Sequence, residues 1–189
     1  MLCLAQEPEA DRLLSESPLA LVIGMVLDQQ VPLEWAFRGP SELARRLGGP
    51  LDAGALARMD PERLTALFAA KPSLHRYPAA MAKRVQALST EIAEHYGGDA
   101  ATIWTGVETG QALLARVKAL PGFGDQKARI FVALLAKQFG VRPDGWAEAS
   151  VPFGEMGSFR SVADIVDEAS LVKVREYKKE MKAAAKAPQ

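Results

Sequence analysis

The sequence contains few of the residues that bind metals or cross-link a chain. It has one cysteine, Cys3, and two histidines among 189 residues. A single thiol excludes internal disulfides, an iron–sulfur cluster and a cysteine-based structural zinc site. His75 and His95 are too isolated to suggest a metal site, so we expect no metal cofactor. Such cysteine usage is typical of the reducing cytoplasm, and we expect the protein there.

Long apolar runs and a signal peptide are also missing. Charged residues, glycine or proline interrupt every apolar stretch before it reaches the length needed to cross a bilayer. The first eight residues are too few and too acidic for a secretory signal peptide. We therefore expect a protein without membrane contact.

The chain also lacks an excess of positive charge. Its 23 basic and 23 acidic residues cancel, whereas dedicated nucleic-acid binders are usually basic. The distribution is uneven, because residues 113–142 contain six basic residues and one acidic residue. Residues 173–186 contain six basic and two acidic residues. Such asymmetry can create a basic face on a neutral molecule, although an ordinary solvated helix surface looks the same.

The sequence does contain a series of helical segments. Residues 19–30 are nearly all apolar and follow the helix-start signal Ser17-Pro18, so we expect a buried helix. Helical spacing of apolar residues or capping signals predict further helices. These lie at residues 40–48, 60–70, 78–96, 109–120, 125–139 and 167–186. Residues 141–161 are expected to be mostly loop, and no stretch alternates like a strand, so the predicted fold class is all-α.

A short segment between two of these helices reads Leu120-Pro121-Gly122-Phe123-Gly124. Two glycines around one apolar residue favour a tight hairpin whose backbone can approach another molecule closely. The next helix begins at Asp125, so its free amides and its dipole would face whatever lies at the hairpin. Such amides suit a phosphate. The alternative is a plain helix–helix turn.

In this context the hairpin resembles the DNA-anchoring motif of the helix-hairpin-helix-GPD superfamily of base-excision DNA glycosylases. Residues 17–31 are similar to the early helix of the family, which ends in a glutamine-bearing turn. Here the turn reads Gln29-Gln30-Val31, a form closest to the alkyladenine glycosylase branch. Residues 81–98 are similar to the long helix that precedes the hairpin. The resemblance spans roughly residues 17–146.

The resemblance implies two helical lobes with a DNA-binding cleft between them, in a short form without an iron–sulfur cluster. Residues 17–137, with the hairpin at 120–124, would form a helical-barrel lobe. Residues 1–16 and 138–189 would form the second lobe. The implied partner is double-stranded DNA with a damaged or mispaired base, bound by a nucleoid-associated monomer. The hairpin, Lys127 and Arg129 would contact the DNA, with a monovalent cation at the hairpin and no other cofactor.

The family places a catalytic aspartate one helix beyond the hairpin. Asp144 is the only carboxylate in the loop after that helix, and it stands 18 residues after Gln126. Gln126 occupies the position of the catalytic lysine in lyase-type members. Asp144 would stabilise positive charge on the sugar and orient a water molecule. Because Gln126 has no amine for a Schiff base, the resemblance implies a monofunctional glycosylase. Alternatively, Asp144 caps a short helix.

Several other side chains are candidates for contacts with an opened duplex. Gln29 or Gln30, of which the resemblance favours Gln30, would fill the space left by a flipped base. Arg76 or Tyr77 precedes the long helix, where the family places a wedge that props the duplex open. Aromatic rings can line a base pocket, although they are more often part of the core. The aromatic candidates are Trp35, Phe37 and Trp146.

The sequence leaves three functions open. The first is a monofunctional DNA glycosylase that hydrolyses the N-glycosidic bond of a flipped damaged base. The second is a non-catalytic DNA- or lesion-binding protein of the same fold, which the neutral net charge favours. The third is a helical protein-interaction module in which the hairpin is only a turn. Salt-dependent affinity for DNA would separate the third function from the other two.

Overall fold

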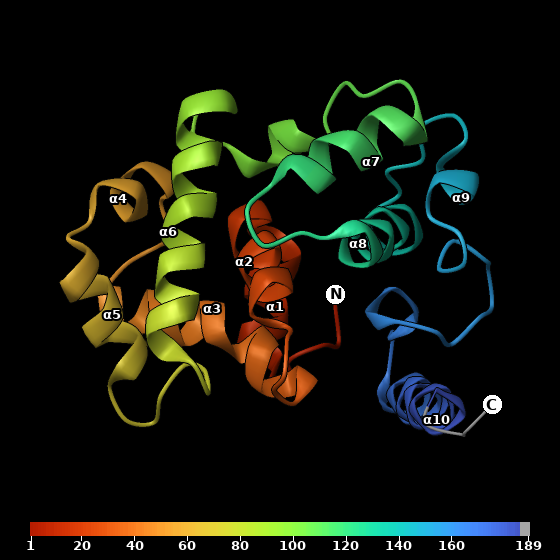
Figure 1. Cartoon of the computed structure of the whole chain (residues 1–189), viewed down its shortest axis with the longest axis horizontal. Helices are drawn as coiled ribbons and strands as arrows, with labels where there is room; N and C mark the ends of the chain where they lie inside the picture. The colour runs from red at the N-terminus through yellow and green to blue at the C-terminus, as the bar shows by residue number, and fades with distance from the viewer. Residues whose placement is uncertain (186–189) are drawn as a thin grey trace.

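The computed structural model describes residues 1–185, which form an all-helical protein (Figure 1). The predicted all-α class is confirmed, since the described residues contain no strand beyond one isolated bridge between Thr109 and Asp144. The first half of the chain contains α1 (Pro8–Glu16), α2 (Pro18–Leu27), α3 (Leu33–Leu47), α4 (Ala53–Arg58), α5 (Pro61–Ala69) and α6 (Pro78–His95). The second half contains η1 (Ala100–Ile103), α7 (Gly110–Ala119), α8 (Asp125–Gln138), α9 (Trp146–Ala149), η2 (Val162–Asp164) and α10 (Glu168–Ala184).

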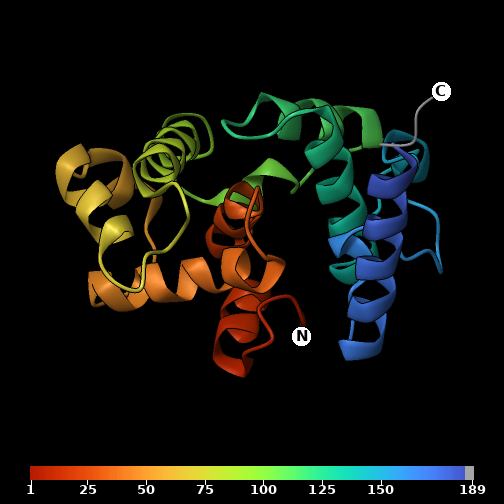
Figure 2. The same cartoon turned by 60° about the horizontal axis from the view of Figure 1, so that its bottom comes forward.

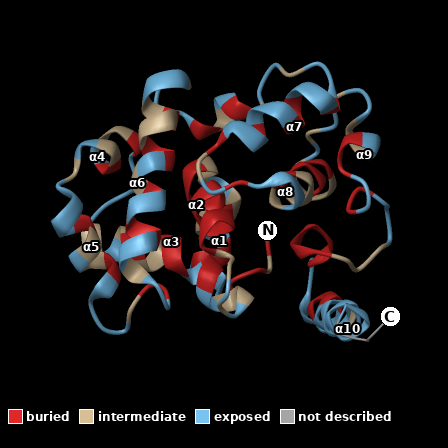
Figure 3. Cartoon of the chain, viewed as in Figure 1, coloured by how far each residue is buried: buried red, intermediate tan, exposed pale blue. Residues whose placement is uncertain are grey.

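Helix α2 lies at the centre of the fold. The hydroxyl of Ser17 caps its first turn by accepting the N–H of Ala20 at 3.2 Å, as the helix-start signal predicts. Its residues from 19 to 27 are all buried, so the whole circumference of the helix is covered (Figure 3). Helices α4 to α6 lie on one side of α2, and α7 to α10 lie on the other side in both views (Figures 1 and 2).

Helix α3 is longer than the sequence predicts. The expected start at Pro40 is wrong, because the helix begins at Leu33 and carries Pro40 in its interior. A proline there removes one helical hydrogen bond, but Phe37, Gly39 and Pro40 are buried against the core. Phe37 packs against α2 at Gly24, which also removes it as a base-pocket candidate. Tertiary packing thus overrides the local start signal.

The N-terminal segment packs on the same centre. Helix α1 contacts α2 and α3, and the guanidinium of Arg38 in α3 donates to the carbonyl of Ala5 at 2.9 Å. The sequence-based division grouped residues 1–16 with the C-terminal residues. In the structure these residues lie against helices of the region 17–137. No helix among residues 1–185 is both long and apolar enough to cross a bilayer.

A buried ion pair fastens the C-terminal segment to α8. The ammonium of Lys137 lies 2.5 Å from the carboxylate of Asp164 in η2, and the two side chains are 7% and 3% exposed. Asp164 also accepts the N–H groups of Arg160 and Ser161 at 2.8 and 3.1 Å. Since η2 packs against both α8 and α10, this pair sets where α10 stands. Lys186, which the sequence placed in the last helix, lies outside the described residues.

We expect the substitution Lys137→Met to lower the free energy of unfolding by about 3 kcal/mol, because it leaves a buried carboxylate without its cation. Urea denaturation checks this value. The control is Lys118→Met, which breaks a pair with Asp125 whose side chains are 45% and 53% exposed. This control should cost less than about 1 kcal/mol. Equal costs for the two variants would contradict the role given to the buried pair.

Candidate nucleic-acid interface

The predicted hairpin forms at residues 120–124. The N–H of Phe123 donates to the carbonyl of Leu120 at 3.1 Å. Gly122 has a φ of +89°, and a Cβ there would lie 3.1 Å from the side chain of Val26 in α2. Glycine is therefore required at this position, because the positive φ disfavours other residues and a side chain would crowd Val26. Leu120 and Phe123 are buried, so the hairpin exposes mainly its backbone.

The start of α8 presents main-chain N–H groups without acceptors. Gly124 is the N-cap residue and supplies no side-chain cap. Within residues 1–185, no protein acceptor bonds the N–H of Gly122, Gly124, Asp125, Gln126 or Lys127. Unsatisfied amides of this kind, together with the helix dipole, can bind an anion.

Two cationic side chains predicted to contact DNA are engaged in hydrogen bonds with other groups of the protein. The ammonium of Lys127 donates to the carbonyls of Met25 and Val26 at 2.6 and 3.4 Å, in the last turn of α2. Burial lowers the pKa of Lys127, and the charge of Asp28 opposes this effect. Arg129 bonds the carboxylate of Asp125 at 2.8 Å and the carbonyl of Ala149 at 3.2 Å. A ligand at the hairpin would therefore meet main-chain N–H groups rather than these two cations.

The turn after α2 is tied to the loop before α6 by a buried histidine. His75 is 0% exposed. Its Nε2 lies 3.0 Å from the carbonyl of Gln29, and its Nδ1 accepts the N–H of Tyr77 at 3.0 Å. This pairing requires a neutral ring with the proton on Nε2. Burial lowers the pKa of His75, in keeping with the neutral form.

Four of the predicted wedge and pocket residues gather around this histidine. The rings of Trp35 and Tyr77 lie 6.4 and 6.1 Å from the His75 ring, and they are partly exposed. The guanidinium of Arg76 lies 5.5 Å from the Tyr77 ring centre. The fourth residue, Gln29, bonds His75 through its carbonyl. Residues of the segments 29–35 and 75–77 thus form one aromatic surface, which we call the His75 cluster.

The two glutamines of the turn are in different situations. The side chain of Gln29 donates to the carbonyl of Val26 at 2.6 Å and accepts a hydrogen bond from Arg84. Gln30 is exposed, has a φ of +57°, and its side chain makes no hydrogen bond within residues 1–185. Of this pair, Gln30 is therefore the residue free to meet a ligand.

Asp144 and Gln126 are not brought together. Gln126 is exposed in the first turn of α8. Asp144 is exposed at the start of α7, where its N–H donates to Glu108 and its carbonyl accepts the N–H of Gly110. Asp144 thus lies beside the first residue of α7, and the 10 residues of α7 separate this end from the hairpin by about 15 Å at 1.5 Å per residue. Asp144 does not cap α9 either, because the N-cap residue is Gly145. Trp146 lies beside Asp144, with the guanidinium of Arg142 6.0 Å from its ring centre.

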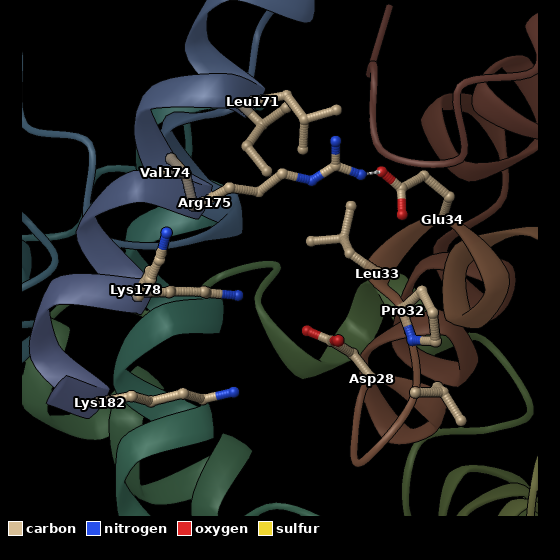
Figure 4. A pocket seen from close by; sticks show the side chains of 12 residues that line it. Asp28, Pro32, Leu33, Glu34, Leu171, Val174, Arg175, Lys178 and Lys182 are labelled. Atoms are coloured by element: carbon tan, nitrogen blue, oxygen red, sulfur yellow. Dashed lines mark hydrogen bonds and ion pairs between the residues drawn. The ribbon is translucent and has the colours of Figure 1, made fainter. Parts of the chain in front are cut away.

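A cleft of about 430 Å³ opens between α10 and the segment that joins α2 to α3 (Figure 4). Asp28 lies on one wall, and burial raises its pKa while the charges of Lys178 and Lys127 oppose the rise. Glu34 on the same wall is ion-paired with Arg175 of α10. Asp28 was not among the site residues predicted from the sequence. The available signal was a carboxylate placed directly after an entirely apolar helix.

Comparison with known proteins adds no further assignment. No protein-family model and no curated protein matches this chain. Among residues 1–185, no group of three or more histidine, cysteine or acidic side chains could hold a metal ion. The function must therefore be argued from the hairpin, the His75 cluster and the cleft.

The histidine predicts a pH dependence of stability. Because the pKa of folded His75 lies below its usual value of 6.5, the unfolded chain takes up the proton more readily. His75 therefore contributes stability above about pH 6.5 that is lost as the pH falls. We expect His75→Asn to flatten the decline in unfolding free energy between pH 7.5 and 5, measured by urea titrations. Trp35→Phe changes the same cluster without removing a titrating group and should keep the wild-type slope.

Proposed function

We propose that this protein binds double-stranded DNA and acts in base-excision repair as a monofunctional DNA glycosylase. The observation that supports this best is the row of acceptor-free main-chain N–H groups at the hairpin. These groups belong to a hairpin that Val26 and Lys127 hold against the end of α2. The Gln29-Gln30 turn comes directly after α2 in the chain. A phosphate site, a free glutamine and an exposed aromatic surface therefore share one end of α2.

The hairpin would hold a DNA phosphate mainly through its main-chain N–H groups. Amides at a helix start bind phosphate by hydrogen bonds and by the helix dipole. Lys118 and Arg129 share the single carboxylate of Asp125, so these two cations leave only one net positive charge beside the hairpin. We therefore expect weaker salt dependence than a lysine-rich surface would give.

The monovalent cation implied by the resemblance would be bound by main-chain carbonyls of the hairpin. The carbonyls of Pro121, Gly122 and Phe123 accept no hydrogen bond within residues 1–185, which fits such a ligand set. When bound, the cation would add positive charge beside the phosphate.

Gln30 and the His75 cluster would contact the bases of the opened duplex. Gln30 could enter the space vacated by an extruded base, while Tyr77 and Trp35 offer rings on which bases can stack. The cleft volume of about 430 Å³ is within the range of small-ligand sites, roughly 300–1,000 Å³. With Gln126 at the start of α8, the Schiff-base chemistry of a lyase has no amine at that position.

A second candidate function is lesion or DNA binding without catalysis. The position of Asp144 favours it, because the carboxylate predicted to be catalytic stands about a helix length from the hairpin. Binding would then rest on the same hairpin amides and the same aromatic surface.

The hairpin can be tested by a substitution that should stabilise the protein. Gly124 has a φ of −90°, and a Cβ there meets nothing within 4 Å. Gly124→Asp would cap α8 and raise the unfolding free energy by roughly a few tenths of a kcal/mol. It would also place a negative charge where a phosphate should bind. We expect at least a tenfold loss of duplex affinity, measured by fluorescence anisotropy at two salt concentrations.

The matched control for this experiment is Gly49→Asp. Gly49 is exposed, and a Cβ there also meets nothing within 4 Å, so the change in composition and net charge is identical. Its DNA affinity should stay within about twofold of wild type. Equal affinity of Gly124→Asp and wild type would remove the hairpin from the interface.

Base release tests the enzymatic part of the proposal. Duplexes carrying uracil, hypoxanthine, alkylated purines or oxidised bases are incubated with excess protein, and the free base is quantified. We expect the wild type to release a base from one class without strand cleavage. Asp144→Asn should release it at a similar rate, since Asp144 lies far from the hairpin. Loss of release with DNA binding retained would restore Asp144 as the catalytic residue. Binding without release of any base would support the non-catalytic function.

A further inference from the structure

We infer that Asp28 is the catalytic carboxylate of this protein and that it faces the sugar of a nucleotide held in the cleft beside α10. This inference rests on the proposed function, since it names the group that would act in base release. It replaces Asp144, the residue implied by resemblance, with a carboxylate that the fold places next to the hairpin.

Asp28 is the carboxylate of the cleft that remains free to act. Glu34, the other acidic residue of the cleft, is engaged by Arg175. The carboxylate of Asp28 accepts no hydrogen bond within residues 1–185, and it points into the open space in front of α10 (Figure 4). A partly buried carboxylate without a donor is costly to keep, and such groups are concentrated at functional sites.

The position of Asp28 relative to the hairpin fits this role. Asp28 comes two residues after Val26, whose side chain packs under Gly122 and whose carbonyl accepts from Lys127. The charge of Lys127, in the first turn of α8, acts on the carboxyl of Asp28. The hairpin and the cleft therefore both lie at the end of α2, so a duplex held by a phosphate at the hairpin would pass close to Asp28.

The opposite wall of the cleft suits the rest of a nucleotide. Lys178 and Lys182 extend from α10 into the same space as Asp28 (Figure 4). Neither forms an ion pair within the part of the chain that the structure describes. Their ammonium groups can take the phosphate that flanks an extruded nucleotide. Apolar side chains at the base of the cleft, from Leu33, Leu171 and Val174, provide a surface for the base itself.

The chemistry balances with water as the only co-substrate. The bond between C1′ and the base nitrogen breaks, and its electron pair leaves with the base. The carboxylate of Asp28 stabilises the positive charge that develops on the sugar. Water then adds its oxygen to C1′ and passes a proton to Asp28. The departed base takes up one proton from solvent, and Asp28 returns its proton to solvent.

The test uses two duplexes that resemble the reacting sugar and need no knowledge of the damaged base. One carries a pyrrolidine abasic analogue, which is cationic at neutral pH, and the other carries the neutral tetrahydrofuran analogue. We expect the full-length wild type to bind the pyrrolidine duplex at least tenfold more tightly. Asp28→Asn should lose most of this preference while its affinity for the tetrahydrofuran duplex stays within about threefold. Its base release should fall at least a hundredfold, a loss within the range for a positioned acid or base group.

The control is Glu62→Gln, which removes one negative charge from an exposed side chain of α5 outside the cleft and should keep the preference. Asp28→Ser serves as a second variant if Asp28→Asn melts below the assay temperature. A preference that survives in the Asp28 variants would overturn the inference. Wild type that binds both duplexes equally would overturn it too, while leaving DNA binding intact. Wild type that binds neither duplex would instead overturn the proposed function.

Discussion

The ammonium of Lys127 is the group on which the geometry of the candidate interface depends. Helix α2 is buried along its whole length, so its last carbonyls need donors that water cannot supply. Lys127 meets this need from the first turn of α8, through the carbonyls of Met25 and Val26. Hydrogen bonds of this charged kind contribute roughly 1.5–3 kcal/mol each. The contact therefore fixes the hairpin beside the end of α2 from which the Gln29-Gln30 turn continues.

The same contact determines the electrostatics of the surface. Because Lys127 is turned inward, the start of α8 presents amides rather than an ammonium, and a ligand there must accept hydrogen bonds. The neighbouring Asp28 feels Lys127 only as a nearby charge, which offsets part of the cost of burying its carboxyl. A carboxyl kept at this cost, beside the proposed anion site and in an open cleft, is explained better by chemistry than by stability.

Local sequence patterns predicted those helices that are marked by a capping residue or by regularly spaced apolar residues. The capped apolar stretch at α2 and the periodic residues of α6 and α8 carry their own evidence, as does the hairpin with its two glycines. The start of α3 could not be predicted, since burial of Pro40 depends on α2 and not on neighbouring residues. The position of Asp144 follows from the path of the chain after α8, which returns it to the start of α7. The role of Lys127 and the cleft in front of Asp28 depend on contacts between residues about 100 and 150 positions apart, which no local pattern encodes.

The cleft is bounded by two attachments of unequal strength. At its base, η2 is fixed to α8 by the buried pair of Lys137 and Asp164, whose loss should cost several kcal/mol. At its mouth, Arg175 is 57% exposed and its pair with Glu34 contributes about 1 kcal/mol or less. The start of α10 is thus positioned firmly, while the ion pair of Arg175 and Glu34 across the opening can be broken at a small cost in free energy. The proposed nucleotide site would need this difference, because a firmly attached helix would keep Asp28 and the lysines in register and a weak ion pair would let the ligand enter.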